Sequence, residues 1–273
     1  MPMQTLTEIR SLLAERGLRP KHRLGQNFLH DQNQLRKLLD AAALEPGEVV
    51  LEVGPGTGTL TEALVERGAV VIACELDGDL ASLIEERLGD RITLIRGDCL
   101  GSSRSLSSSV VEAIGGRPFK LIANLPYQAA SPLMSTLALH HPNCSGQFVT
   151  IQREVADRLL ASPGTKAYGP LTIIIRAFAE IERIGTLSPQ CFWPAPEVTS
   201  AMVAIRRKPH VPIDDPARFA RFVTRLFTKR RKQLGGTFRN EQLMWKELPG
   251  ITPTQRPEEL TITQLLELER LVS

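Results

Sequence analysis

The amino-acid sequence predicts an α/β fold with a doubly wound parallel sheet, followed by a small C-terminal α-helical domain. Short apolar runs of strand length alternate with segments of helical periodicity, and the connections contain Pro, Gly and Ser. Three prolines then interrupt a basic segment, after which helical periodicity resumes. We therefore expect one large domain over residues 1–208 and a helical domain over residues 209–273.

The elements of the large domain can be assigned in chain order. An N-terminal helix is indicated by apolar side chains at helical spacing, at Leu6, Ile9, Leu12 and Leu13. Strands are expected at Val49–Val53, Val70–Cys74, Ile92–Ile95, Leu121–Ala123 and Gln147–Gln152. Helices between the first of these strands are expected at Thr59–Arg67 and Leu80–Leu88. A further apolar run, Leu171–Ile175, also has the length of a strand.

The composition limits the class of protein. With 273 residues, of which 42% are hydrophobic, the chain can bury a core. Charges interrupt the first thirty residues too often for a signal peptide, and the longest apolar runs are far too short to cross a membrane. We therefore expect a cytoplasmic protein with no membrane partner.

Cysteine and histidine spacing indicates neither a metal site nor a disulfide framework. The neighbouring His140 and His141 would point in different directions on a helix. The cysteines lie far apart without a C-x-x-C pair, at Cys74, Cys99, Cys144 and Cys191. We expect reduced, buried thiols and no bound metal.

The net charge of +3 is modest, but it is unevenly distributed. Between Ala204 and Lys232 there are ten Lys or Arg residues against Asp214 and Asp215. Asp215 and Pro216 have the residue types of a helix N-cap and a first helical position. The helix that they predict has an apolar face at Phe219, Phe222, Val223, Leu226 and Phe227. Its opposite face is basic, at Arg218, Arg221, Arg225, Lys229 and Lys232.

A charged helix face is most often a solvated surface. This face carries a single sign, unrelieved by acids, so we favour contact with RNA. A smaller basic group near the N-terminus also suits a polyanion, at Arg16, Arg19, Lys21 and Arg23.

A glycine-rich loop, Glu52–Gly58, directly follows the first expected strand and opens the first helix after it. Nucleotide cofactors bind at this place in α/β sheets, and Gly54 and Gly56 let the backbone turn sharply and approach a ligand. Glu75 ends the next strand nineteen residues after Gly56, a spacing typical of an acid that accepts hydrogen bonds from ribose hydroxyls. Asp98, which ends the third strand, is placed to meet an adenine amino group.

These three strand ends fit one adenosine-containing ligand, either S-adenosyl-L-methionine or NAD. The loop has the pattern G-x-G-x-G, whereas dinucleotide-binding loops have G-x-G-x-x-G. Glu52 would lie badly beside a pyrophosphate but suits the ammonium group of a methionine moiety. S-adenosyl-L-methionine is therefore favoured, and an NAD-dependent oxidoreductase is the disfavoured alternative.

The turn after the fourth strand, Asn124-Leu125-Pro126-Tyr127, carries the predicted chemistry. An exocyclic adenine amine is a poor nucleophile because its lone pair is delocalised into the ring. The Asn124 side-chain oxygen and the Leu125 carbonyl can accept both amine hydrogens and localise that lone pair toward a methyl donor. Pro126 fixes the turn, and Tyr127 offers a ring on which the base can stack.

An Asn-x-Pro-Tyr turn can also be no more than a loop, but its place after a cofactor loop favours catalysis. Phe192, in the proline-rich segment 189–196, is a second candidate for stacking on a flipped-out base. An apolar plug in that loop explains Phe192 nearly as well.

Together these motifs resemble the ribosomal RNA adenine dimethyltransferases over nearly the whole chain. The resemblance rests on segments in this order: Gly25–Asp31, Glu52–Gly58, Glu75–Asp77, Gly97–Asp98, Asn124–Tyr127, Gln152–Ala156, Pro163–Gly169 and Phe192–Ser200. Within the family, the chain is most similar to the bacterial enzymes that act on small-subunit rRNA, and Arg230-Arg231-Lys232 resembles that branch too.

The resemblance implies a Rossmann-like class I methyltransferase fold and S-adenosyl-L-methionine as the methyl donor. The implied reaction dimethylates the 6-amino groups of two adjacent adenosines in the 3′-terminal hairpin loop of small-subunit (16S) rRNA, with a role in ribosome biogenesis. The residues implied in cofactor binding are Asn27, Leu29, Gly54, Gly56, Glu75, Asp98 and Asn124. The implied partner is rRNA within a pre-ribosomal small subunit, with the enzyme acting as a monomer.

Two departures from the family pattern bear on how the target is positioned. Gln128-Ala129-Ala130 follows the catalytic turn where the family usually has Asn-Ile-Ser, and Glu197 stands where a Lys is common. Two functional alternatives stay open. One is a large-subunit rRNA adenine dimethyltransferase of the antibiotic-resistance type, against which Phe192 and the basic helix argue. The other is a non-catalytic rRNA-binding assembly factor, against which the intact catalytic turn and Glu75 argue.

Overall fold

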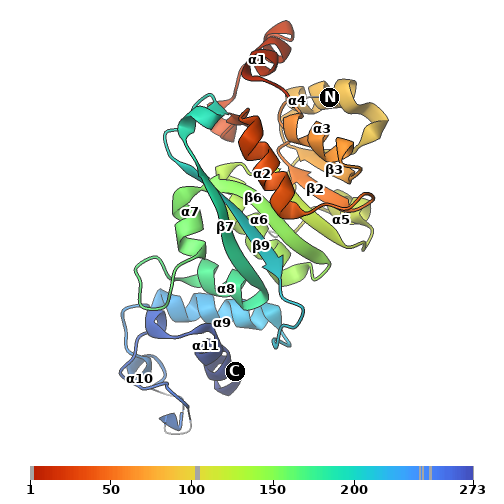
Figure 1. Cartoon of the computed structure of the whole chain (residues 1–273). Helices are drawn as coiled ribbons and strands as arrows, with labels where there is room; N and C mark the ends of the chain where they lie inside the picture. The colour runs from red at the N-terminus through yellow and green to blue at the C-terminus, as the bar shows by residue number, and fades with distance from the viewer. Residues whose placement is uncertain (1–2, 102–104, 240, 242, 246–247, 273) are drawn as a thin grey trace.

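The computed structural model describes residues 3–101, 105–239, 241, 243–245 and 248–272. Within them, a seven-stranded sheet in the order β4-β3-β2-β5-β6-β9-β7 forms the centre of the molecule (Figure 1). Its strands are β2 (Val49–Val53), β3 (Val70–Glu75), β4 (Thr93–Arg96), β5 (Phe119–Asn124), β6 (Cys144–Gln152), β7 (Ala179–Leu187) and β9 (Ser200–Arg207). A separate two-stranded sheet pairs β1 (Phe28–Leu29) with β8 (Phe192–Trp193).

Helices cover both faces of the seven-stranded sheet (Figure 1). One face carries α2 (Gln32–Ala42), α3 (Thr59–Glu66) and α4 (Gly78–Leu88). The other face carries α5 (Ser108–Ile114), α6 (Tyr127–His140) and α7 (Arg153–Leu159). The doubly wound α/β architecture is therefore confirmed. The N-terminal helix α1 (Leu6–Glu15) packs against α4 through Ile9 and Leu13.

The direction of one strand differs from the prediction of a parallel sheet. The strands from β4 to β6 run parallel, but β9 is antiparallel to both of its neighbours, β6 and β7. A parallel pair needs a long crossover, usually a helix, whereas β7 and β9 are joined only by a loop with η3 (Pro189–Cys191) and β8. This loop places Phe192 and Ser200 at the end of the sheet where β5 and β6 finish.

The predicted strands are all present, with ends shifted by a few residues. The run Leu171–Ile175, however, lies in helix α8 (Pro170–Phe178), not in a strand. Pro170 occupies its first turn, and the helix contacts α6, α7 and α9 (Pro216–Thr228). A helix enclosed in this way can be apolar nearly all round, so a continuous apolar run does not distinguish it from a strand.

The C-terminal segment forms a helical layer on α8, away from the sheet (Figure 1). It contains α9, α10 (Leu234–Thr237), η5 (Pro257–Glu259) and α11 (Ile262–Leu271). As predicted, Asp215 is the N-cap of α9, and its carboxylate accepts the Arg218 N–H at 2.8 Å. Phe219, Phe222, Val223 and Leu226 are buried and extend the hydrophobic core from the sheet layer into this segment.

Two further predictions concern the cysteine thiols and the lack of membrane-spanning helices. All four cysteines are buried free thiols, as predicted. In the part of the chain that the structure describes, no helix combines the length and apolar character needed to span a membrane.

Candidate active site

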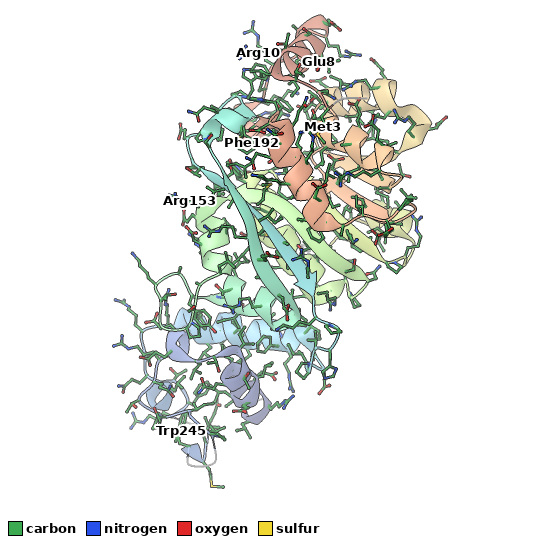
Figure 2. The ribbon with its side chains drawn as sticks, viewed as in Figure 1. Met3, Glu8, Arg10, Arg153, Phe192 and Trp245 are labelled. Atoms are coloured by element: carbon green, nitrogen blue, oxygen red, sulfur yellow. The ribbon has the colours of Figure 1, made fainter. Side chains whose placement is uncertain are left out.

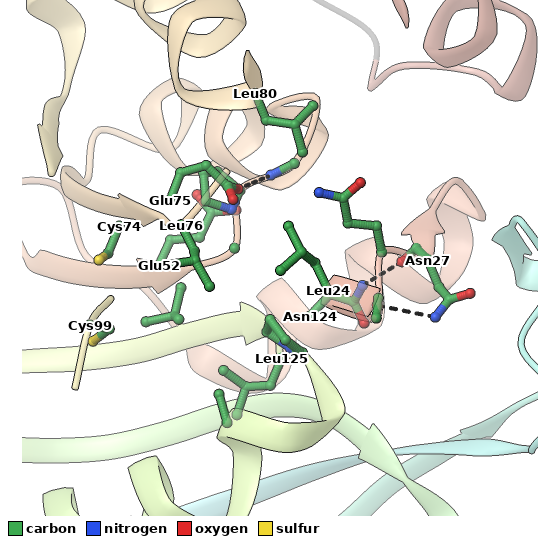
Figure 3. Close-up of a pocket in the computed structure, with 18 of the residues that line it drawn as sticks. Leu24, Asn27, Glu52, Cys74, Glu75, Leu76, Leu80, Cys99, Asn124 and Leu125 are labelled. Carbon is green, nitrogen blue, oxygen red and sulfur yellow. Dashed lines mark hydrogen bonds between the residues drawn. The ribbon is translucent and has the colours of Figure 1, made fainter. Parts of the chain in front are cut away.

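A cavity of about 310 Å³ opens at the carboxyl ends of the parallel strands (Figure 3). All the site residues predicted from the sequence line it: Asn27, Leu29, Gly54, Gly56, Glu75, Asp98, Asn124, Leu125, Pro126, Tyr127 and Phe192. The fold therefore brings the predicted cofactor residues and the predicted catalytic residues into one cavity. Their individual roles stay predictions.

The glycine-rich loop between β2 and α3 forms one wall. Gly54 and Gly56 have φ of 75° and 63°, a left-handed conformation that residues with a Cβ rarely adopt. A Cβ on Gly54 would lie 3.2 Å from the Pro126 ring, and one on Gly56 would lie 2.9 Å from the Phe28 ring. The loop is thus in close contact with both the catalytic turn and the N-terminal segment.

Glu75, the last residue of β3, braces this loop and faces the cavity. Its carboxylate accepts the Gly56 N–H at 3.3 Å and the Asp77 N–H at 2.9 Å. Burial raises the pKa of Glu75, while these two N–H donors oppose the rise. Asp98 lies on the neighbouring wall, where its carboxylate accepts the Leu100 N–H at 2.9 Å. Two carboxylates thus border the part of the cavity expected to hold an adenosine.

Glu52 is a buried carboxyl at the cavity wall that a cationic ligand would stabilise. The residue is 1% exposed, and no described group hydrogen-bonds its Oε2 atom. Burial raises the pKa of Glu52 to about 8, and the charge of nearby Glu75 adds to the rise. An unpartnered buried acceptor is costly, so a bound ammonium group would relieve the cost. Glu52 therefore offers an acceptor that fits the ammonium end of S-adenosyl-L-methionine.

Asn124 ends β5 at the centre of the cavity wall. Its side-chain Nδ2 donates a hydrogen bond to the Asn27 carbonyl at 3.0 Å (Figure 3). Because the amide nitrogen is engaged there, the amide oxygen is left as the acceptor that a target amine would need. The next residue is fixed through its backbone, since the Leu125 N–H donates to the Thr150 carbonyl at 3.1 Å.

Two aromatic residues border the same end of the cavity. Tyr127 begins α6, and its hydroxyl lies 3.0 Å from the hydroxyl of fully buried Ser200 on β9. Phe192 on β8 is 3% exposed and lines the cavity. Such burial suits an apolar plug as well as a stacking surface, so both interpretations of Phe192 stay open.

The two departures from the family pattern occupy different surroundings. Gln128 and Ala129 line the cavity, and Ala130 is buried in the core beneath it. Glu197 is exposed on the loop between β8 and β9. Only the first departure can therefore touch a base bound in the cavity.

Sequence reasoning missed the role of Asp77. This buried carboxylate caps α4 and also receives Lys21 at 2.7 Å and the Gln26 amide at 2.8 Å. It therefore anchors the segment that leads into Asn27. An N-cap before a helix was detectable from sequence, but contacts with residues more than fifty positions away were not.

The apolar wall was also missed. Leu76, Leu80 and Leu100 line the cavity near Glu75 and Asp98. Leu76 is 57% exposed, which is unusual for a leucine beside a buried strand end. Because Leu76 lies together with Leu80 and Leu100 on the cavity wall, a ligand bound in the cavity would contact this apolar surface.

The basic surfaces are more neutralised than predicted. Arg218 pairs with Glu269 of α11 at 2.5 Å, and Arg230 pairs with Glu258 of η5. The expectation of a face unrelieved by acids is therefore wrong at Arg218, where a distant part of the chain supplies the acid, and at Arg221, which lies 4.0 Å from Asp215. The remaining basic residues of that face are exposed: Arg221, Arg225, Lys229 and Lys232.

The N-terminal basic group is also paired in part. Arg16 contacts Glu86 at 2.5 Å, and Lys21 contacts Asp77 and Asp79 at 2.7 Å. These pairs join the start of the chain to α4 and its cap.

Comparisons with known proteins identify the family to which the chain is similar. The family model described as ribosomal RNA adenine dimethylase matches residues 17–273. A protein of Magnetococcus marinus named ribosomal RNA small subunit methyltransferase A is 39% identical over 267 residues, covering 95% of this chain and 94% of that protein. A protein of Syntrophus aciditrophicus with the same name is 36% identical, covering 96% of this chain and 98% of that protein.

Solved structures share the fold. A dimethyladenosine transferase from Plasmodium falciparum superposes with a TM-score of 0.72 at 23% identity, covering 88% of this chain and 95% of that one. The 23S rRNA methyltransferase ErmE superposes with a TM-score of 0.68 at 25% identity, covering 90% of this chain and 100% of that one.

Proposed function

The chain belongs to the ribosomal RNA adenine dimethylase family, and from that membership we infer that it dimethylates adenines of small-subunit rRNA. It is an S-adenosyl-L-methionine-dependent methyltransferase. We propose that its targets are the 6-amino groups of two adjacent adenosines in the 3′-terminal hairpin loop of the 16S rRNA. The single observation that supports this chemistry best is the fixed amide of Asn124 beside the cofactor loop.

The proposed role of the catalytic turn follows from hydrogen-bond directions. With Nδ2 held by the Asn27 carbonyl, the Asn124 oxygen can accept one amine hydrogen, and the Leu125 carbonyl can accept the other. Holding both hydrogens in the plane of these acceptors localises the amine lone pair. S-adenosyl-L-methionine supplies an electrophilic methyl group on its sulfonium. Pro126 packs on Gly54 and so sets the distance between the turn and the cofactor loop.

Of the other cavity residues, some would contact S-adenosyl-L-methionine and others the target adenine. We propose that Glu52 receives the ammonium group of the cofactor, Glu75 its ribose hydroxyls and Asp98 its adenine amino group. Tyr127, oriented by Ser200, supplies a ring for the target adenine. Phe192 supplies a second ring for stacking on the same adenine.

The C-terminal segment offers a basic surface for the RNA partner. We propose that residues 209–273 form an rRNA-binding domain that uses the exposed basic residues of α9. The substrate would be rRNA within a pre-ribosomal small subunit, methylated in the cytoplasm by a monomer. The large-subunit alternative is not favoured, because the relatives at 36–39% identity carry the small-subunit name.

A direct experiment tests the reaction and the substrate together. The protein and labelled S-adenosyl-L-methionine are incubated with small subunits from a strain that lacks this methylation, and the digested nucleosides are analysed by mass spectrometry. We expect dimethyladenosine that maps to the two adjacent residues of the 3′ hairpin. Transfer to large-subunit rRNA alone would support the antibiotic-resistance type, and cofactor binding without transfer would support an assembly factor.

A further inference from the structure

The two-stranded sheet joins the cofactor side of the cavity to the target side. Phe28 pairs with Trp193 and Leu29 pairs with Phe192, and the ladder continues with a hydrogen bond from the His30 N–H to the Cys191 carbonyl at 3.0 Å. Leu29 and Phe192 both line the cavity. The strand that follows Asn27 and the loop that carries Phe192 are therefore held by one set of backbone hydrogen bonds.

A ring stack reinforces this sheet and reaches the glycine-rich loop. The Phe28 and Trp193 ring centroids lie 6.3 Å apart with an interplanar angle of 26°. The Phe28 ring also packs closely on Gly56. A Cβ added at Gly56 would lie only 2.9 Å from ring atoms of Phe28. Movement of Trp193 would therefore shift Phe28 and, through it, the glycine-rich loop expected to hold the cofactor.

Helix α1 holds Trp193 from outside the cavity. The Arg10 guanidinium carbon lies 5.2 Å from the centroid of the Trp193 ring, within the range of a cation–π interaction. The start of the chain is fixed as well, because the Gln4 amide donates to the Thr57 carbonyl at 3.0 Å. Arg10 and Phe192 lie toward the same end of the molecule, whereas Trp245 lies at the opposite end (Figure 2).

We propose that Trp193 is a positioning residue that holds residues 25–29 against the cofactor loop. Through this segment it keeps the Asn27 carbonyl in place for the Asn124 amide. Trp193 is not among the residues that line the cavity, so it would act through Phe28 and Asn27, which are. The inference rests on the proposed cofactor site, and it predicts that donor affinity and catalytic geometry depend on the same ring stack.

The first experiment measures binding of S-adenosylhomocysteine by calorimetry. Trp193→Ala should weaken binding by about tenfold, because it removes both the aromatic stack and the cation–π contact. Trp193→Phe, which keeps a ring on Phe28, should stay within about threefold of the wild type. Equal affinity of a folded Trp193→Ala variant would overturn the proposal. Absence of binding by the wild type would instead overturn the cofactor site on which the proposal rests.

Kinetics provide a second readout. At saturating donor, Trp193→Ala should still have a reduced kcat, because the Asn27 carbonyl no longer fixes the Asn124 amide, and Trp193→Phe should restore it. Arg10→Gln should raise the KM for the donor, whereas Arg10→Lys should not. A Trp193→Ala variant with an unchanged kcat at saturating donor would contradict the link to Asn124.

A spectroscopic test observes Trp193 itself, in a variant that keeps this residue and its contacts. The chain has two tryptophans, and Trp245→Phe leaves Trp193 as the sole reporter. Trp245 packs on Phe238 in the C-terminal segment, so this variant should bind S-adenosylhomocysteine like the wild type. We expect ligand binding to change the emission of Trp193. In the matched Trp193→Phe variant, emission from Trp245 should stay constant. No change in Trp193 emission at saturating ligand, verified by calorimetry, would overturn the proposal.

Discussion

The side-chain amide of Asn124 donates to the backbone carbonyl of Asn27, a residue 97 positions earlier in the chain, at 3.0 Å. Because the amide nitrogen is engaged in this bond, the amide oxygen is the atom left to accept hydrogens from a target amine. It also makes the catalytic turn depend on the N-terminal segment. Substitutions in either segment should therefore affect the geometry of the catalytic turn.

Asn124→Ala should abolish methyl transfer, with kcat reduced by about a hundredfold or more, because one of the two amine acceptors is removed. Affinity for S-adenosylhomocysteine should change little, since Asn124 lies at the edge shared with the target. Single-turnover transfer and calorimetry measure the two quantities. Activity equal to the wild type would remove Asn124 from the catalytic role.

Glu75→Ala should weaken cofactor binding by about ten- to a hundredfold, because hydrogen bonds to a charged acceptor are lost and the Gly56 N–H loses its partner. Calorimetric titration checks this expectation. Glu112→Ala, at an exposed position of α5, is the matched control and should bind normally. Unchanged affinity in Glu75→Ala would place the ribose elsewhere.

Glu52 should make the stability of the ligand-free protein depend on pH. Burial raises its folded-state pKa from 4.5 to about 8, so between these values the folded protein binds more protons than the unfolded chain. The free energy of unfolding should therefore decrease as pH rises from about 5 to 8, by at most about 1.4 kcal/mol per pH unit from this group. Urea unfolding of Glu52→Gln should lack this component, and parallel pH profiles for variant and wild type would contradict the assignment.

Cofactor binding should expel the proton of Glu52 at neutral pH, because an ammonium group beside the carboxyl favours its charged form. Affinity for S-adenosylhomocysteine should therefore rise between about pH 6 and pH 8. Calorimetry in buffers of different ionisation enthalpy counts the released proton. Binding by the wild type without proton release would mean that Glu52 does not receive the ammonium group.

The exposed part of the basic helix should control the salt dependence of RNA binding. Arg225→Gln combined with Lys229→Gln should reduce the slope of log affinity against log salt concentration by about two. Arg218→Gln is the informative comparison, because Arg218 is paired with buried Glu269. That change should instead lower stability by about 1–2 kcal/mol, with a smaller effect on the slope. Identical slopes for the double variant and the wild type would place the RNA elsewhere.

The sequence predicted what is encoded in contiguous segments. Glu52 to Gly58 and Asn124 to Tyr127 each lie at a strand end, and parallel strands place such ends together, so their meeting in one cavity was predictable. The capped helix after Asp215 was predictable for the same local reason. The antiparallel direction of β9 was not, because it depends on how the chain returns after β7.

Contacts between distant residues were beyond sequence reasoning. Tyr127 meets Ser200, Phe28 meets Trp193 and Arg218 meets Glu269 only after the chain has folded. The apolar run Leu171–Ile175 has the length of a strand but lies in α8, and the sequence did not distinguish the two for a related reason. Its neighbours α6, α7 and α9 enclose it, and composition alone does not reveal how many sides of an element are covered.

The contact between Gly54 and Pro126 has a consequence for how this protein can change over generations. The space left at Gly54 is set by the Pro126 ring, with 3.2 Å between that ring and any added Cβ. A residue with a side chain at position 54 is tolerable only after a smaller residue replaces Pro126, and Gly54 is further constrained by its positive φ. Drift among descendants of this sequence should therefore leave Gly54 and Pro126 fixed together.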